Sequence, residues 1–212
     1  MKKTFLALLC LVLASSALRA DASTDTHVYA GTSIAYARLG SDWKNACGGS
    51  LAIGIGFAER HAIELDVTHF KTEAKEIFWY GNKTELNVTP ILATYKYVLP
   101  LGKQFSLFFG ISAGVTDFKS TETWSYGYDI IFSNPSSGLS ANPASTTPAP
   151  IPPEKITNTD HPFTAGVQFG VAYAFKENMA ATLGIKTLRM EKTEVTSSGV
   201  YQTVQLGLRY TF

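Results

Sequence analysis

The sequence predicts an all-β fold, an eight-stranded antiparallel up-and-down β-barrel that spans a membrane. Segments of about ten residues alternate between large apolar side chains and small or polar ones, which is typical of membrane barrel strands. The connections between these segments alternate between short and long. No stretch after the first twenty residues is apolar for long enough to form a membrane-spanning helix.

The first twenty residues have the pattern of an export signal. Lys2 and Lys3 provide the positive start, and an apolar run from Phe5 to Ala14 follows that is too short to cross a bilayer comfortably. Small residues then make Ala20 or Ala22 the expected cleavage point. We therefore expect residues 1–20 to be a cleaved signal peptide and residues 21–212 to form the barrel, with an uncleaved anchor as the alternative.

Three segments show the strand alternation most clearly. In Gly49–Ala58, Phe163–Phe175 and Thr203–Phe212, one face is large and apolar and the other is small or polar. A water-soluble barrel would turn the large apolar face inward. Here the opposite face is rich in glycine and alanine, which leaves a narrow interior, so the large residues are expected to face lipid.

Five weaker segments complete the expected set. They are Val28–Ala37, Ala62–Phe70, Leu86–Val98, Phe105–Phe118 and Met179–Met190. The total is eight, an even number, as in bacterial single-chain barrels. In Leu86–Val98 the alternation does not decide which face turns inward, and Pro90 interrupts the hydrogen-bond ladder.

The connections predict how the barrel is oriented. Outer-membrane barrels have short periplasmic turns and longer extracellular loops, and the observed order fits a periplasmic N-terminus. The short connections are Glu59–His61, Leu99–Gln104 and Lys176–Asn178. The long ones are Leu39–Gly48, Lys71–Glu85, Lys119–Pro162 and Glu191–Gly199. Lys119–Pro162 is rich in Pro, Ser and Thr, so we expect an irregular extracellular loop, although Trp124, Tyr126 and Tyr128 could extend the barrel strand.

The C-terminal residues carry a resemblance to a known family. Gln205 and Gly207 are followed by aromatic residues at Tyr210 and Phe212, and this resembles the targeting signal of outer-membrane barrels. Over its whole length beyond residue 20, the chain looks like the small eight-stranded barrels of the opacity-protein-like or outer-membrane-protein-A-like group. The resemblance implies a place in the bacterial outer membrane, contact with its lipid, and insertion by the barrel-assembly machinery.

Several charged residues are expected inside the barrel, where solvent is scarce and charges must pair. They are Glu64, Asp66, Lys96, Lys186 and Arg209. Eight strands leave an interior about wide enough for side chains alone. We therefore expect a paired, closed lumen, and a gated ion or proton path is the alternative. The residues expected to free space are Gly54, Gly56, Gly110, Gly114, Gly166, Gly170, Gly184 and Gly207.

Other candidate features predict no chemistry. Aromatic residues near the strand ends are expected to form two interfacial girdles. They are Trp79, Tyr80, Tyr95, Tyr97, Tyr173, Phe175, Tyr210 and Phe212. His27, His61, His69 and His161 lack metal-ligand spacing, so we expect no metal and no cofactor. Beyond the signal, only Cys47 remains, which excludes an intramolecular disulfide.

The composition and these patterns leave several functions open. Three of the 18 basic residues and no acidic residue precede Asp21, so the remainder has 15 basic and 17 acidic residues, and nucleic-acid binding is not indicated. We expect a non-enzymatic surface protein, structural or binding host or environmental ligands through its loops. A small porin-like transporter is the alternative. A lipid-modifying barrel enzyme and a soluble calycin-like ligand binder are less favoured.

Overall fold

The computed structural model describes residues 26–40, 42–75, 83–124, 154–192 and 199–212. The expected signal peptide lies outside these residues. The strands are β1 (His27–Arg38), β2 (Ala46–Phe57), β3 (His61–Glu73), β4 (Lys83–Pro100), β5 (Phe105–Trp124), β6 (Glu154–Asp160), β7 (Phe163–Lys176), β8 (Met179–Met190) and β9 (Val200–Thr211). None of the described residues belongs to a helix long and apolar enough to span a membrane.

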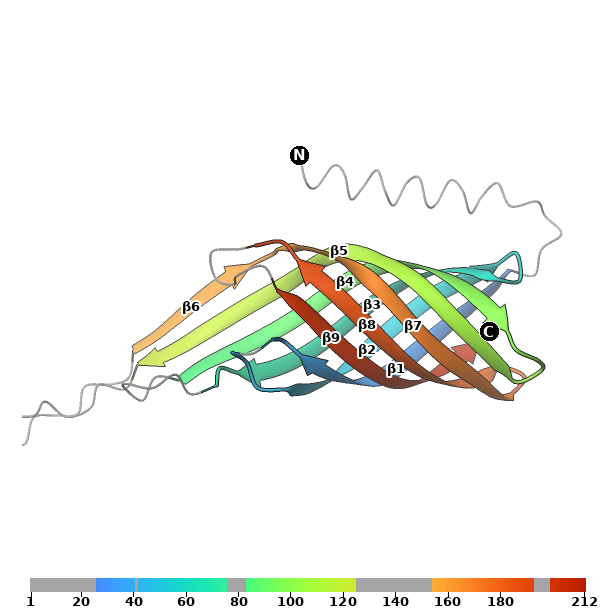
Figure 1. Ribbon diagram of the computed structural model, residues 1–212, viewed down its shortest axis with the longest axis horizontal. Helices are drawn as coiled ribbons and strands as arrows, with labels where there is room; N and C mark the ends of the chain where they lie inside the picture. The colour runs from blue at the N-terminus through green and yellow to red at the C-terminus, as the bar shows by residue number, and fades with distance from the viewer. Residues whose placement is uncertain (1–25, 41, 76–82, 125–153, 193–198) are drawn as a thin grey trace, which may run out of the picture.

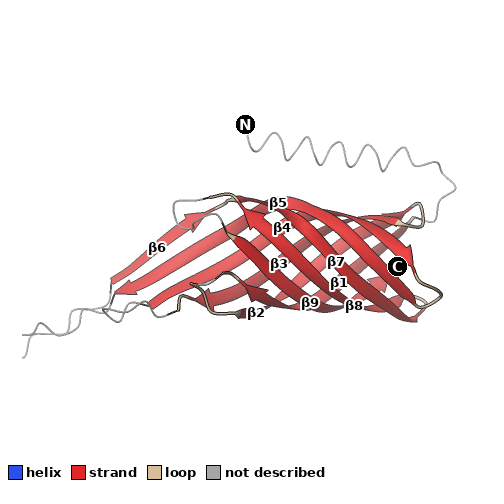
Figure 2. Ribbon diagram, viewed as in Figure 1, coloured by secondary structure: helices blue, strands red, loops and turns tan. Residues whose placement is uncertain are grey.

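Eight of the strands close into an antiparallel barrel, as the sequence predicted (Figure 1, Figure 2). β1 and β9, the first and last strands of the chain, pair with each other. β4 also pairs with β5, and this pairing closes the ring of eight strands. Among the described residues, closure leaves no unpaired strand edge around the barrel wall, which a bilayer requires because lipid cannot satisfy backbone polar groups.

β6 is a ninth strand that the sequence did not predict, since residues 119–162 were expected to form a loop. β5 continues to Trp124, and β6 pairs with its last part from Phe118↔Asp160 to Trp124↔Glu154. β7 pairs with the earlier part of β5, up to Val115↔Phe163. β5 and β6 therefore project beyond the barrel (Figure 1). Residues 125–153, with Tyr126 and Tyr128, lie outside the described part of the chain.

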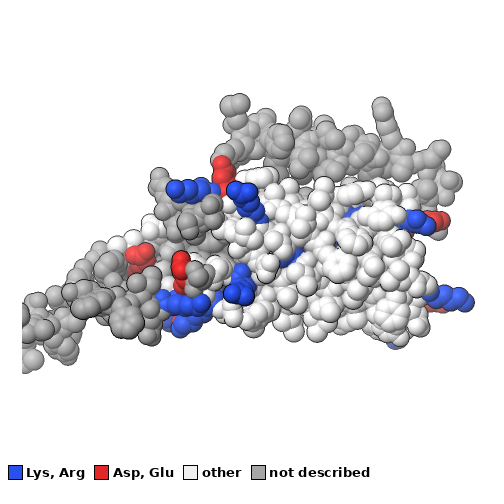
Figure 3. Space-filling view, viewed as in Figure 1, with Lys and Arg blue, Asp and Glu red and all other residues white. Residues whose placement is uncertain are grey.

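The outward face forms an apolar belt around the barrel. The large residues of the three clearest segments face outward, as predicted, with Leu51 68% exposed and Leu206 61% exposed. On the visible face, charged side chains gather toward the two ends, and the wall between them is almost free of charge (Figure 3). Because apolar side chains lose nothing by facing lipid, this belt is the membrane-spanning surface.

The strand β4 settles the parity that the sequence left open. Leu86, Val88, Leu92 and Thr94 are buried, and Ile91 is exposed, so the even-numbered residues turn inward. Pro90 is also fully buried and sits opposite Thr116 on β5. A proline cannot donate to the ladder, but the strand stays continuous on both sides of it.

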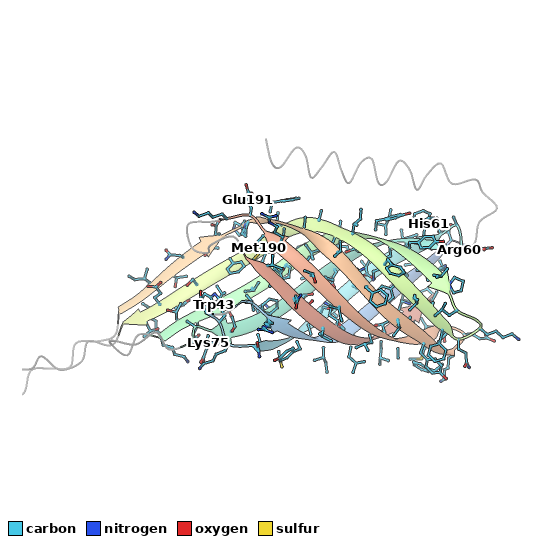
Figure 4. All side chains as sticks on the ribbon, in the orientation of Figure 1. Trp43, Arg60, His61, Lys75, Met190 and Glu191 are labelled. Atoms are coloured by element: carbon cyan, nitrogen blue, oxygen red, sulfur yellow. The ribbon has the colours of Figure 1, made fainter. Side chains whose placement is uncertain are left out.

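The two ends of the barrel differ. At the short-turn end, residues 58–60, 101–104 and 177–178 connect the strands. Ala58 and Glu59 take left-handed φ values of 49° and 58°, which let the first of these turns reverse the chain tightly. At the long-loop end, residues 42–44 pair with residues 73–75 through the Trp43↔Ala74 bridge, which lengthens the wall beside β3. Arg60 and His61 mark the first end, and Trp43 and Lys75 the second (Figure 4).

Candidate functional site in the barrel lumen

The five charged residues expected inside the barrel all line its lumen. Lys96 on β4 lies opposite Ala62, two residues from Glu64 on β3, which lets the two side chains meet across the inner face. The Lys96 ammonium lies 2.5 Å from Glu64 Oε2. The Tyr29 hydroxyl on β1 donates to the same carboxylate oxygen over 3.1 Å. Glu64 is therefore held by one charged and one neutral donor.

Asp66 and Lys186 form the second ion pair, which spans the lumen from β3 to β8. The Lys186 ammonium donates to Asp66 Oδ1 over 2.9 Å, and both residues are 2% exposed. Thr68 donates a further bond to Asp66 over 3.0 Å. These two donors offset the cost of burying the Asp66 carboxylate, which would be high for a carboxylate without partners.

Arg209 on β9 differs from the two lysines. Its guanidinium lies over the Tyr29 ring, 5.2 Å from the ring centre, in a cation–π contact. Among the described residues, no carboxylate lies within ion-pair distance of Arg209, although the sequence predicted pairing throughout the lumen. Its Nε is buried without a hydrogen-bond partner.

Glycines make room for two aromatic rings rather than for open space. A Cβ at Gly54 would overlap the Tyr29 ring, and a Cβ at Gly170 would overlap the Phe108 ring. Phe108 in turn lies under the Lys96 ammonium, 5.1 Å from it. Neither Tyr29 nor Phe108 was predicted to belong to the lumen. Their signal in the sequence was an aromatic residue on the small or polar face of a strand.

The long-loop end of the lumen is filled by an apolar plug. Phe70, Leu92 and Tyr201 belong to it, each no more than 1% exposed, with the Phe70 and Tyr201 rings 6.1 Å apart. Leu39 and Trp43 pack against it from the loop side. The whole plug consists of Ala37, Ala46, Phe70, Leu86, Val88, Leu92, Phe118, Leu188, Met190 and Tyr201.

The plug marks a reversal in how each strand is patterned. Near the long-loop end of β3, β4 and β5 the outward residues are polar, as at Lys71, Glu85 and Lys119. The inward ones are mostly apolar, with the small polar residues Thr72 and Ser120 among them. This part of the barrel is therefore built like a water-soluble one, and it extends beyond the apolar belt. The plug was not predicted, because one alternation pattern was expected along the whole of each strand.

Between the plug and the short-turn end lies a cavity of about 70 Å³. The charged residues line it together with Tyr29, Phe108 and Gln168. Gln168 on β7 is 6% exposed, and its Nε2 has no hydrogen-bond partner. A volume of this size can hold a few water molecules or one small ion, but it is too small for a substrate.

Outside the barrel, an ion-pair ladder lies on the projecting ends of β3 and β4, beyond the belt. Lys71 lies 2.5 Å from Glu85, and Lys83 lies 3.0 Å from both Glu85 and Glu73. Hydrogen bonds from Lys71 and then from Lys83 lower the pKa of Glu85 to about 2. Lys44 adds a bond to Glu73, so the ladder also fastens the first long loop.

The remaining sequence candidates occupy the wall. His61 stacks on Phe57 and bonds the Tyr95 hydroxyl over 2.6 Å, and His69 bonds Thr89. With Tyr97, Tyr173, Phe175, Tyr210 and Phe212, the His61 and Tyr95 rings lie at the short-turn end of the belt. Cys47 is a free, exposed cysteine near the long-loop end. Trp79 and Tyr80 lie outside the described residues.

The C-terminal pattern lies on β9, the strand that closes the barrel. Tyr210 and Phe212 point outward and contact each other, with ring centres 5.1 Å apart. Gly207 points inward, where a Cβ would lie 2.6 Å from the Thr32 backbone oxygen. Gln205 also points inward and donates to Thr68 over 3.4 Å. In this pattern, the two aromatic residues face lipid, and Gly207 allows β9 to lie close to β1.

Comparison with known proteins agrees with this geometry. The family model described as the outer membrane protein beta-barrel domain matches residues 6–212. The chain belongs to this family. It is therefore a barrel of the bacterial outer membrane, in contact with its lipid, as the sequence predicted.

Solved structures of other outer membrane barrels share the fold. The barrel is similar to OprG from Pseudomonas aeruginosa, with a TM-score of 0.52 and 12% identity over 88% of this chain and 95% of that one. It is also similar to a major outer membrane protein from Thermus thermophilus, with a TM-score of 0.50 and 12% identity over 86% and 99% of the two chains. Neisserial surface protein A gives a TM-score of 0.48 at 16% identity, covering 90% of this chain and 99% of that one. No curated protein sequence matches the chain.

Proposed function

We propose that this outer membrane barrel is a non-conducting surface protein that works through its projecting extracellular part, in a structural or ligand-binding role. The observation that carries the proposal is the filled lumen. Two ion pairs bridge its charged section, and the apolar plug closes the section beyond. An eight-stranded barrel has little more interior than its side chains need.

The projecting part supplies the surface for such a role. β5 and β6 extend past the belt with polar outward faces, and the ladder around Glu85 stiffens the neighbouring hairpin. Loops on a rigid scaffold commonly carry binding specificity. A host or environmental ligand would therefore meet the polar projecting strands and the loops that join them.

Liposome swelling tests the closed lumen against the porin-like alternative. Proteoliposomes containing the barrel should swell no faster in isotonic arabinose than protein-free liposomes. A large-pore porin in parallel liposomes is the positive control. Swelling by arabinose at a rate that rises with the amount of barrel would favour transport and reject the proposal.

Cysteine labelling tests which end faces the cell exterior. In a Cys47→Ser background, Lys155→Cys on β6 should react with a membrane-impermeant maleimide on intact cells. Asn178→Cys in a short turn should react only after lysis, because that turn is expected in the periplasm. The opposite pattern would invert the proposed topology.

The proposal includes the absence of enzymatic activity. A lipid hydrolase would need a nucleophile, a histidine and an acid together on the wall. The described histidines at the wall instead contact Tyr95 and Thr89, and His161 lies 3.3 Å from exposed Asp117. Identical lipid A mass spectra from cells with and without the gene are expected, and a gene-dependent lipid A species would show an enzyme.

A further inference from the structure

Three cations and two carboxylates line the cavity in the barrel lumen. The carboxylates of Glu64 and Asp66 are each held by a lysine. Arg209 is left as the third cation, with an aromatic ring as its contact rather than a carboxylate. The cavity therefore carries one excess positive charge, and a charge in a narrow, poorly solvated interior needs a counter-charge.

A second observation points to the same place. Gln168 lies on β7, away from Arg209 on β9, and its Nε2 is buried without a partner. Arg209 Nε is also buried without a partner. Unfilled buried donors are costly, so two of them around one cavity indicate an acceptor that fills it.

We propose that the lumen cavity binds a small monovalent anion, of the size of chloride, formate or acetate. Arg209 supplies the charge, and Gln168 supplies a neutral donor from across the cavity. The paired lysines Lys96 and Lys186 cancel the repulsion from the two carboxylates. The volume of about 70 Å³ admits such an anion and rejects the bulky sugar acid gluconate.

The structure also indicates the route by which the ion enters. The apolar plug closes the long-loop end of the lumen. Arg209, which is partly exposed, and Val98 and Ser106 near the second short turn line the other side of the cavity. The anion therefore enters from the short-turn end. Binding in the cavity is independent of whether the plug holds, since a leaking barrel could contain the same site.

Crystals of the whole barrel soaked in sodium bromide test the site directly. An anomalous bromine peak is expected beside the Arg209 guanidinium and Gln168 Nε2. The peak should be absent from Arg209→Gln and present in Arg189→Gln, which alters an exposed arginine on β8. Ordered water alone at this position in wild-type crystals would overturn the proposal.

Thermal unfolding in detergent gives an independent solution test. The Tm of the wild-type barrel should rise with chloride concentration relative to sodium gluconate of equal ionic strength. Gln168→Leu keeps the side-chain size and should weaken chloride binding by roughly tenfold, through the loss of one hydrogen bond to a charged acceptor. Arg209→Gln should abolish the chloride response.

The outcomes separate the anion site from the closed lumen. If Arg209→Gln does not fold, Gln168→Leu still decides, because it leaves every charge in place. Equal Tm values in chloride and gluconate for the wild-type barrel, or an unchanged chloride response in Gln168→Leu, would reject the site. Neither result bears on solute transport, which liposome swelling measures.

Discussion

At the residue scale, the inside of the barrel is organised by pairs that the sequence could suggest but not assign. Alternation predicted which charges turn inward, because parity follows directly from strand geometry. It could not predict that Lys96 meets Glu64 or that Lys186 meets Asp66, since these contacts depend on how far each strand is staggered around the barrel. The alternation also could not predict that the Arg209 guanidinium lies over the Tyr29 ring.

The Asp66–Lys186 pair should be costly to break. Lys186→Met leaves Asp66 as a buried carboxylate without its counter-ion and should lower the free energy of unfolding by about 3–5 kcal/mol. Equilibrium denaturation in detergent, followed by tryptophan fluorescence, measures it. Lys44→Met, in an exposed pair, should change little.

The double variant Asp66→Leu/Lys186→Met shows whether the cost comes from the stranded charge. Replacing both partners of a buried pair is often neutral, so this variant should be more stable than Lys186→Met alone. If the single variant unfolds at the same denaturant concentration as wild type, the pair is solvated and the closed lumen is wrong.

Glu85 in the ladder gives a prediction about pH. Its pKa is lowered from 4.5 to about 2, so the charged form is favoured in the folded barrel. The ladder's contribution to stability is therefore complete above pH 4.5 and is lost as the pH falls through about 2. Lys71→Met removes the main cause and should raise the Glu85 pKa toward 4.5.

An NMR titration of the Glu85 side-chain carboxyl measures this pKa. Lys176→Met, which alters an exposed lysine at the opposite end of the barrel, is the control and should leave it unchanged. A Glu85 pKa near 4.5 in the wild-type barrel would show that the ladder does not form in solution.

At the element scale, the eight barrel strands could be predicted because each alternates over its membrane-facing part. β6 could not, because its residues 155–159 are all exposed, whichever face they lie on, and the segment shows no apolar alternation. The extension of β5 to Trp124 was anticipated from its aromatic residue, but the projecting ends of β3 and β4 were missed for a related reason. There the apolar face turns inward, which reverses the rule that identified the strands, and polar outward residues resemble loop composition.

Protease cleavage distinguishes the paired arms of the long connection from the segment between them. Backbone hydrogen bonds pair residues 118–124 of β5 with β6, and this pairing protects the peptide bonds of both strands from cleavage. Proteinase K added to intact cells should therefore cut within residues 125–153 before it cuts either strand. Mass spectrometry locates the first cuts, and first cleavage inside residues 154–160 would contradict the pairing of β6.

The C-terminal pattern on β9 leads to a prediction about insertion into the membrane. Phe212 donates a backbone bond to Val28 on β1 and contacts Tyr210 on the lipid face. We expect deletion of Phe212 to leave export intact and to lower insertion by the barrel-assembly machinery, with protein accumulating in the periplasm. Heat-modifiable migration of outer-membrane fractions measures insertion, and normal migration of the shortened chain would contradict a targeting role. Val200→Thr, at the other end of β9, is the control.

At the scale of the whole molecule, the barrel combines two opposite designs along one axis. In the belt, apolar side chains face lipid and the lumen is polar. Beyond the belt, the outer face is polar and the lumen is mostly apolar. The pattern reverses because the outer face meets lipid in the belt and water beyond it. The plug therefore lies where the barrel leaves the membrane.

Single-channel recording across a planar bilayer tests the closed lumen most directly. Wild-type protein, inserted and verified by heat-modifiability, should give no conductance steps over the leak of the bilayer itself. The variant Phe70→Ala/Leu92→Ala/Tyr201→Ala, which truncates three large side chains of the plug, should give measurable openings and so shows that this assay detects an open lumen. Steady, ion-selective currents from the wild-type barrel would contradict the closed lumen and establish the porin-like function in its place.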